Sequence, residues 1–168
     1  MFKNTLFCAL TSCSYSYTMN SLHWSLKSFQ ELSVDELYAL MRLRQEVFIV
    51  EQNCPYLDAD GKDKYAHHLM GYNNGKLVAY ARLLPPGISY TEASIGRVIT
   101  ATDERGKAFG QALMVKAIEE MQNLYGNVPI RIGAQQYLKV FYESFGFVQE
   151  GEPYLEDGIP HIIMLRQV

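Results

Sequence analysis

Basic and small side chains gather at one point of the chain, where an apolar segment meets a predicted helix. The turn Arg105-Gly106-Lys107-Ala108-Phe109-Gly110 follows a strand-like segment and opens that helix. The first backbone N–H groups of a helix have no partner within the helix and carry partial positive charge. Together with the charges of Arg105 and Lys107 they predict a binding site for a phosphate or pyrophosphate group.

Two common phosphate-binding motifs do not match this turn. A P-loop would need glycine followed by lysine at positions 111 and 112, where the chain has Gln111 and Ala112. The dinucleotide-binding pattern Gly-x-Gly-x-x-Gly is also absent. Taken alone, the turn fits an anion site and an ordinary structural turn before a helix equally well.

Several longer segments resemble a known family. They are Leu43–Phe48, Val50–Tyr56, Ala79–Leu84, Ile95–Val98, Phe141–Phe147 and Glu156–His161. The pattern Arg105-x-x-Ala108-x-Gly110 is similar to the pyrophosphate loop Gln/Arg-x-x-Gly-x-Gly/Ala of the GNAT N-acetyltransferases. Residues 22 to 166 resemble that family, and in particular its ElaA-type members. The resemblance implies an α/β fold (α+β layered), with a central mixed, mostly antiparallel sheet flanked by helices.

The resemblance also implies acetyl-CoA as co-substrate, without a metal. Its pantetheine arm would lie between the strand at 97–99 and the strand at 130–134, where a backbone N–H of Val98 or Ile99 would polarise the thioester carbonyl. The cofactor-binding positions expected on this basis are Val98, Ile99, Arg105, Gly106, Lys107, Ala108, Phe109, Gly110, Gln111, Gln135 and Phe141. Ala108 departs from the family's usual glycine and is tolerable if its φ is negative.

Tyr142 is the candidate general acid. It lies in Phe141–Phe147, which resembles the segment where many GNAT enzymes keep a tyrosine near the CoA sulfur. Its phenol would donate a proton to the leaving thiolate. The alternative is an aromatic side chain packed in the core, with its hydroxyl on a backbone group.

The general base has several candidates on or beside the loop expected to cover the acceptor. An attacking amine must first lose a proton at neutral pH, and Glu51 and His68 are the proposed acceptors of that proton. Asp60 and Asp63 lie on the same loop. Solvated loop acids and a structural strand histidine are the competing interpretations.

The expected acceptor-binding residues are Arg82, Arg97, Asp60, Asp63 and His161. Charged residues inside apolar strands need partners, so the two arginines either bind an acceptor carboxylate or pair with loop acids. His161 is an acceptor-pocket residue or a structural histidine at a strand start. The acids of the loop, with Glu156 and Asp157, favour a cationic acceptor such as a polyamine, an amino sugar or a lysine-like amine.

Two other functions stay open. The chain could bind CoA without turnover, as a regulatory module, or it could use a longer acyl donor. A cysteine nucleophile is not favoured because no histidine is adjacent to Cys54. Cys54 and the histidines show no recognised metal-ligand spacing. The expected partner is a small-molecule or peptide amine, and because GNAT relatives are often dimers, a homodimer is possible.

The elements that must position these residues can be read from periodicity and turn signals. Ser33-Val34-Asp35-Glu36 is a capping box that opens a helix ending near 48–51. Asn74-Gly75 predicts a hairpin between strands at 68–72 and 76–84. The remaining elements expected are a strand at 93–100, a helix at 109–124, a strand at 129–134, a helix at 138–145, and strands at 147–149 and 161–165.

Composition fits one soluble domain over residues 20–168. The chain has 168 residues and a net charge of −3, without a Lys/Arg-rich run, so nucleic-acid and membrane partners are not expected. The Ser/Thr/Tyr-rich residues 1–19 are expected to be an extension outside the core. Leu10–Cys13 resembles a lipoprotein cleavage box, but its apolar run is too short for a signal peptide. Three scattered cysteines favour the cytoplasm.

Overall fold

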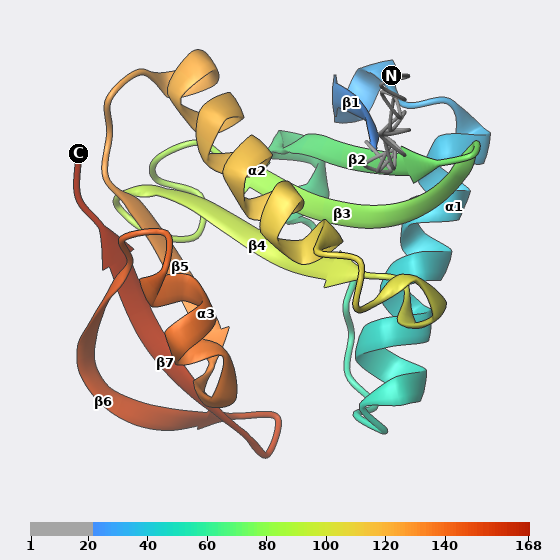
Figure 1. Ribbon diagram of the computed structural model, residues 1–168. Helices are drawn as coiled ribbons and strands as arrows, with labels where there is room; N and C mark the ends of the chain where they lie inside the picture. The colour runs from blue at the N-terminus through green and yellow to red at the C-terminus, as the bar shows by residue number, and fades with distance from the viewer. Residues whose placement is uncertain (1–21) are drawn as a thin grey trace, which may run out of the picture.

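The computed structural model describes residues 22–168, so the extension expected at 1–19, with Cys8 and Cys13, lies outside the described residues. Seven strands form one sheet in the order β1-β2-β3-β4-β5-β7-β6 (Figure 1). The strands are β1 His23–Ser28, β2 His67–Asn73, β3 Lys76–Leu84, β4 Ala93–Thr100, β5 Ile130–Gln135, β6 Val148–Glu156 and β7 Ile159–Arg166. The helices are α1 Val34–Arg44, α2 Phe109–Tyr125 and α3 Lys139–Glu143.

The sheet is mixed and mostly antiparallel, as expected. Strands β1 to β4 pair antiparallel in chain order, and so do β5, β7 and β6. The single parallel pair within the described chain joins β4 to β5, and α2 connects these two strands. Helix α2 packs across β3 and β4, and α1 contacts β3 (Figure 1). The apolar faces of these elements form one hydrophobic core.

The turn and cap signals of the sequence act where they were expected. The Ser33 hydroxyl accepts a hydrogen bond from the Glu36 N–H at 3.2 Å, and the Glu36 carboxylate accepts one from the Ser33 N–H at 2.9 Å. Asn74 and Gly75 have φ values of 50° and 79°, which the tight β2–β3 hairpin requires. Both predictions are confirmed.

Helix α1 does not stop at its regular end. It continues as a π-helical segment, η2 Gln45–Glu51, and the wider turn carries the chain to Glu51 and Gln52 at the end of the segment. A π-helical insertion often marks a functional site. The sequence predicted where the helix ends but not this change of winding.

Candidate active site

The sheet opens between β4 and β5. Within the described chain, these parallel strands are in register only at Ala93–Ile130 and Ser94–Arg131. Beyond these pairs the facing edges, residues 96–100 and 132–135, have backbone groups without a strand partner, whereas β3 and β7 satisfy the other two edges. A cavity of about 880 Å³ occupies the opening. An extended ligand could pair with these free edges as an added strand does.

A bulge in β4 lies on the cavity wall. The register with β3 shifts so that Arg97 and Val98 together oppose Ala81. Arg97 has a φ of 52°, a conformation uncommon for a residue other than glycine. Bulges redirect the chain next to active sites. Val98 and Ile99, which were expected to polarise a thioester carbonyl, both line the cavity.

The turn before α2 has left-handed backbone at two positions, Gly106 with φ 77° and Ala108 with φ 59°. The condition under which alanine would be tolerable at position 108, a negative φ, is therefore not met, and Ala108 has a backbone conformation that L residues rarely adopt. No side chain caps the first N–H groups of α2, which leaves these donors free for an anion. The cavity reaches this turn at Arg105 and Gly110.

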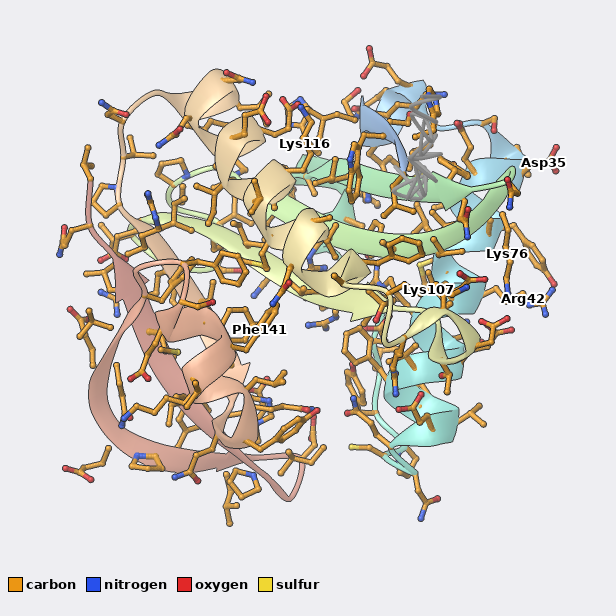
Figure 2. The ribbon with its side chains drawn as sticks, in the orientation of Figure 1. Asp35, Arg42, Lys76, Lys107, Lys116 and Phe141 are labelled. Atoms are coloured by element: carbon orange, nitrogen blue, oxygen red, sulfur yellow. The ribbon has the colours of Figure 1, made fainter. Side chains whose placement is uncertain are left out.

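Phe141 of α3 lies against the start of α2 (Figure 2). A Cβ placed on Gly110 would lie 3.9 Å from the Phe141 ring, an ordinary van der Waals contact, so the two elements are close neighbours at this point. Phe141 and Gln135, both predicted to bind the cofactor, line the cavity.

Five predicted cofactor-binding positions do not line the cavity: Gly106, Lys107, Ala108, Phe109 and Gln111. The Phe109 side chain belongs to the hydrophobic core and does not line the cavity. The Lys107 ammonium pairs with the Glu104 carboxylate at 2.7 Å. Their backbone N–H groups remain predicted contacts.

Arg105 and Glu51 form a two-pronged ion pair at the cavity. Arg105 Nη1 and Nη2 donate to Glu51 Oε1 and Oε2 at 2.7 and 2.9 Å, and the Thr102 hydroxyl donates to Oε2 at 2.6 Å. Arg105 and then Thr102 lower the pKa of Glu51 by hydrogen bonding to its carboxylate. A carboxylate held in this way is a weak proton acceptor, so the arrangement does not favour Glu51 as the general base.

Tyr142 lines the cavity from α3, and its side chain is nearly enclosed. Its ring packs edge-on against Phe141 and Phe147. Burial raises the pKa of Tyr142, because the phenolate would lose its hydration. Among residues 22–168 no backbone group accepts a hydrogen bond from the Tyr142 hydroxyl, unlike in the packing alternative. The phenol is therefore protonated, and its hydroxyl has no hydrogen-bond partner within residues 22–168; its role as a proton donor stays a prediction.

His68 lies outside the cavity, contrary to its predicted role as a base. Its ring is fully buried, with Nδ1 2.8 Å from the Tyr80 hydroxyl and Nε2 3.1 Å from the Asp63 carbonyl oxygen. A carbonyl only accepts, so Nε2 carries the proton and Nδ1 accepts from Tyr80. Burial lowers the pKa of His68. The histidine is structural, and the prediction is wrong because neither nitrogen can reach a ligand.

Asp63 is also a structural residue and does not line the cavity. Its Oδ1 accepts from Arg44 at 2.8 Å and from Arg82 at 3.1 Å. Both arginines are buried charges, and shared hydrogen bonds to one carboxylate are the kind of partner such charges need. The expectation of an acceptor contact at Asp63 is corrected accordingly.

Arg82, Arg97 and Asp60 do line the cavity. Arg82 Nη1 and Nη2 donate to the two Asp60 oxygens at 2.7 and 2.8 Å. Arg97 Nε donates to Asp58 Oδ1 at 2.6 Å, and its guanidinium lies 5.8 Å from the ring centres of Phe48 and Tyr56. The arginines are thus neutralised by loop acids, the structural alternative that the sequence left open.

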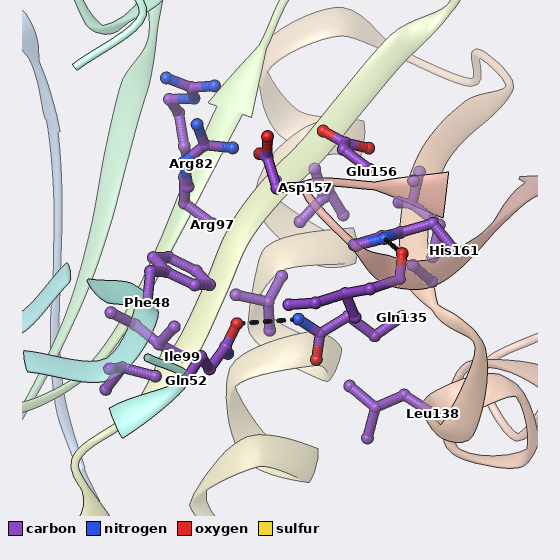
Figure 3. Close-up of a pocket in the computed structure, with 18 of the residues that line it drawn as sticks. Phe48, Gln52, Arg82, Arg97, Ile99, Gln135, Leu138, Glu156, Asp157 and His161 are labelled. Atoms are coloured by element: carbon purple, nitrogen blue, oxygen red, sulfur yellow. Dashed lines mark hydrogen bonds between the residues drawn. The ribbon is translucent and has the colours of Figure 1, made fainter. Parts of the chain in front are cut away.

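The β6–β7 hairpin forms the opposite wall (Figure 3). Glu156, Asp157 and His161 line the cavity there, facing Arg82 and Arg97. Neither Glu156 nor Asp157 belongs to an ion pair within residues 22–168, so the negative charge of this wall is not neutralised. The Cys54 thiol donates to the Asp157 carbonyl oxygen at 3.7 Å and links the hairpin to residues 52–66 between η2 and β2, the covering loop.

One hydrogen bond spans the opening itself. Gln135 Nε2 at the end of β5 donates to Gln52 Oε1 at 3.0 Å (Figure 3). Sequence analysis did not identify Gln52, Phe48, Tyr56 or Tyr90 as cavity residues. Gln52 and Tyr56 lie in the family-like segment Val50–Tyr56 and Phe48 lies in Leu43–Phe48, so these three had a signal and Tyr90 had none.

The described part of the chain, residues 22–168, contains neither a cluster of metal ligands nor a membrane-spanning helix. Among its His, Cys, Asp and Glu side chains, no three are arranged to hold a metal ion. None of its helices combines the length and the apolar run needed to cross a membrane.

Comparison with known proteins gives one consistent family. The family described as an acetyltransferase (GNAT) domain matches residues 34–167. Protein ElaA of Escherichia coli K12 is 47% identical over 149 residues, which are 88% of this chain and 97% of ElaA. The crystal structure of Escherichia coli ElaA has a TM-score of 0.82 at 46% identity, covering 87% of this chain and 99% of that one. An acyl-CoA N-acyltransferase from Pseudomonas aeruginosa has a TM-score of 0.83 at 44% identity and covers the same shares. The chain therefore belongs to the GNAT family of acyl-CoA N-acyltransferases, in its ElaA-type branch.

Proposed function

We propose that this protein transfers the acetyl group of acetyl-CoA directly to a primary amine on a cationic acceptor. The observation that carries the proposal is the continuity of one cavity. It runs from Arg105 beside the uncapped N-terminus of α2, along the open edge of β4, to Tyr142 and the acidic β6–β7 wall. A diphosphate, an extended arm, a thioester and an amine would each meet suitable groups in that order.

Acetyl-CoA supplies an activated acyl group and a thiolate leaving group. The protein binds and orients the reactants and transfers protons. The α2 N–H groups and Arg105 hold the diphosphate. Backbone groups at Val98 and Ile99, beside the β4 bulge, stabilise the negative charge that develops on the carbonyl oxygen. As the C–N bond forms and the C–S bond breaks, the Tyr142 hydroxyl donates a proton to the leaving sulfur.

The unpaired carboxylates of the hairpin support a cationic acceptor. Glu156 and Asp157 are exposed, line the cavity and lie opposite arginines whose charge is already balanced. The field at the amine-binding end is therefore negative, which attracts a second positive charge on the acceptor.

Calorimetric titration of the full chain with acetyl-CoA tests the donor. Micromolar binding is expected, and binding should weaken in Arg105→Ala. ATP is the control for binding of the nucleotide and phosphates without the pantetheine arm, and dephospho-CoA is the control for the 3′-phosphate that it lacks. A folded protein that does not bind acetyl-CoA would refute the donor assignment. Turnover with acetyl-, propionyl- and butyryl-CoA then sets the acyl preference, and a longer acyl-CoA giving the highest kcat/KM would contradict the acetyl assignment.

A matched set of amines tests the acceptor. Thiol release should be faster with 1,4-diaminobutane than with butylamine, and slowest with 4-aminobutyrate, because these amines differ mainly in the charge of the far group. In the double variant Glu156→Gln/Asp157→Asn, the rates with the three amines should differ less, mainly because their KM values become more alike. A preference for 4-aminobutyrate would refute the cationic acceptor.

A further inference from the structure

His161 is a cavity histidine whose ring is held by the backbone. It lies on β7 opposite Gln135 of β5 and Tyr154 of β6. His161 Nδ1 is 2.9 Å from the Ile159 carbonyl oxygen. A carbonyl oxygen can only accept, so Nδ1 carries the proton in the neutral ring, and the lone pair is on Nε2. No hydrogen bond within residues 22–168 uses Nε2.

Tyr154 packs near the His161 ring, and the neighbouring carboxylates of the β6–β7 hairpin would attract a cation to this part of the cavity. The Tyr154 ring lies 5.9 Å from the imidazole, tilted by 34°. The Tyr154 hydroxyl donates to Glu156 Oε2 at 3.2 Å, so one side chain links the ring to a carboxylate of the same wall. Asp157 lies beside Glu156 at the hairpin turn. An ammonium group drawn to these carboxylates would arrive next to the free nitrogen.

The other candidate bases are engaged elsewhere. Glu51 is held by both arms of Arg105, and Asp60 by both arms of Arg82. His68 uses both ring nitrogens in the core. Of the histidines in residues 22–168, His161 alone lines the cavity. A general base must reach the proton that it removes, and His161, unlike Glu51, Asp60 and His68, presents an unused nitrogen in the cavity beside the carboxylates of Glu156 and Asp157.

We propose that His161 is the general base of the transfer, with Nε2 accepting a proton from the acceptor ammonium. The inference rests on the proposed function. Nε2 takes one proton from R–NH₃⁺, and the resulting R–NH₂ bonds to the acyl carbon. Tyr142 gives one proton to the sulfur and regains one as the new N–H group loses its second proton. The imidazolium releases its proton to water, so the sum is one amide, one CoA thiol and one proton.

The tautomer can be tested without any acceptor. A two-bond ¹⁵N–¹H spectrum of the ¹⁵N-labelled full chain, at alkaline pH where imidazoles are neutral, distinguishes the two tautomers. His161→Gln identifies the His161 signal by its loss. The Nδ1–H pattern is expected, with Nε2 as the bare nitrogen. An Nε2–H pattern would overturn the proposal, whatever the protein does with acetyl-CoA.

Kinetics test the role itself, with the amine of the matched set that gives the fastest thiol release. His161→Gln should lower kcat by roughly 10²–10⁴-fold while acetyl-CoA binding is kept. Added imidazole should restore part of the rate to His161→Ala. The matched control is His67→Gln, a β2 histidine outside the cavity, which should keep full activity.

The outcomes separate the two proposals. Unchanged kcat in His161→Gln would overturn the base assignment while leaving the transferase intact. A rate loss that imidazole cannot rescue, or one confined to KM, would assign His161 to acceptor binding instead and also overturn it. A wild-type chain without turnover would count against the proposed function, and the tautomer result would still stand.

Discussion

Tyr142 decides whether the leaving group is protonated by the enzyme. If its phenol is the general acid, Tyr142→Phe should reduce kcat by roughly 10²–10⁴-fold, because the thiolate must then leave without a proton. Acetyl-CoA affinity should change little, since the ring is kept. The comparison variant is Tyr38→Phe on the exposed side of α1. If both variants keep wild-type turnover, Tyr142 only packs the wall of the cavity.

In the proposed complex, the Glu51 carboxylate and the diphosphate of acetyl-CoA would compete for the Arg105 guanidinium. Arg105→Ala should weaken acetyl-CoA binding by roughly 1–3 kcal/mol, the range for a hydrogen bond to a charged group. Glu51→Gln should strengthen binding by roughly two- to five-fold, because an exposed ion pair of about 0.5–1 kcal/mol no longer competes with the diphosphate. Titration calorimetry measures both, and weaker binding in Glu51→Gln would show that Glu51 instead holds Arg105 ready for the ligand.

Single residues were predictable only where a segment resembled the family or carried a strong local signal. Arg105 and Tyr142 lie in such segments and line the cavity. The roles predicted for Glu51 and His68 depended on contacts that no local pattern contains. Glu51 meets Arg105 across 54 positions, and His68 meets Tyr80 across a strand pair. Such partners become visible only when the sheet is assembled.

The strained backbone of Ala108, at the start of α2, should lower the stability of the protein. Ala108 has a φ of 59°, where glycine has no Cβ penalty, so Ala108→Gly should raise the free energy of unfolding by about 1 kcal/mol. The matched variant Ala112→Gly, on the exposed interior of α2, should lower it by about 1 kcal/mol. Urea denaturation distinguishes the two. If both variants lower the free energy of unfolding by the same amount, Ala108 is not strained in solution.

Elements with strong periodicity or clear turns were predicted closely. The expected strands at 76–84 and 93–100 coincide with β3 and β4, and α2 runs one residue beyond its expected end. β1 was missed because it is a short edge strand in which only Trp24 and Leu26 pack against the core, and neither is fully buried. Most of β6 was missed because Gly151 and Pro153 interrupt it, which an exposed edge strand tolerates. The β4 bulge was not predictable, since its register depends on β3.

At the scale of the whole molecule, a buried ion network joins the covering loop to the sheet. Asp58 accepts from Arg44 of α1 and from Arg97 of β4, and Asp60 pairs with Arg82 of β3. Arg44 is fully buried, so its charge depends on these carboxylates. The network holds in place the loop that lines this end of the cavity, where we propose that the acceptor binds. Loss of one carboxylate should therefore disturb the fold and the acceptor site together.

This coupling predicts how stability changes with pH. Burial alone would raise the pKa of Asp58, but Arg44 and Arg97 outweigh it and hold the pKa below its usual range; Arg82 does the same for Asp60. Because both folded pKa values lie below the unfolded value of about 3.9, the stabilisation is complete above that pH and is lost as the pH falls below it. Thermal unfolding between about pH 7 and pH 2.5 should show a steep loss of stability below about pH 4.

Single substitutions can distinguish the contribution of this ion network from the general loss of stability in acid. Asp58→Asn should cost about 3–5 kcal/mol at neutral pH, because Arg44 keeps a buried charge without its main partner, and the loss of stability below pH 4 should become shallower. Asp103→Asn removes an exposed partner of Lys76 and should change neither quantity much. If Asp58→Asn and Asp103→Asn unfold alike at neutral pH, the buried network does not hold the covering loop in place. The proposed amine site would then need another support than the hydrogen bonds that Asp60 makes with Arg82 of β3 and Asp58 makes with Arg97 of β4.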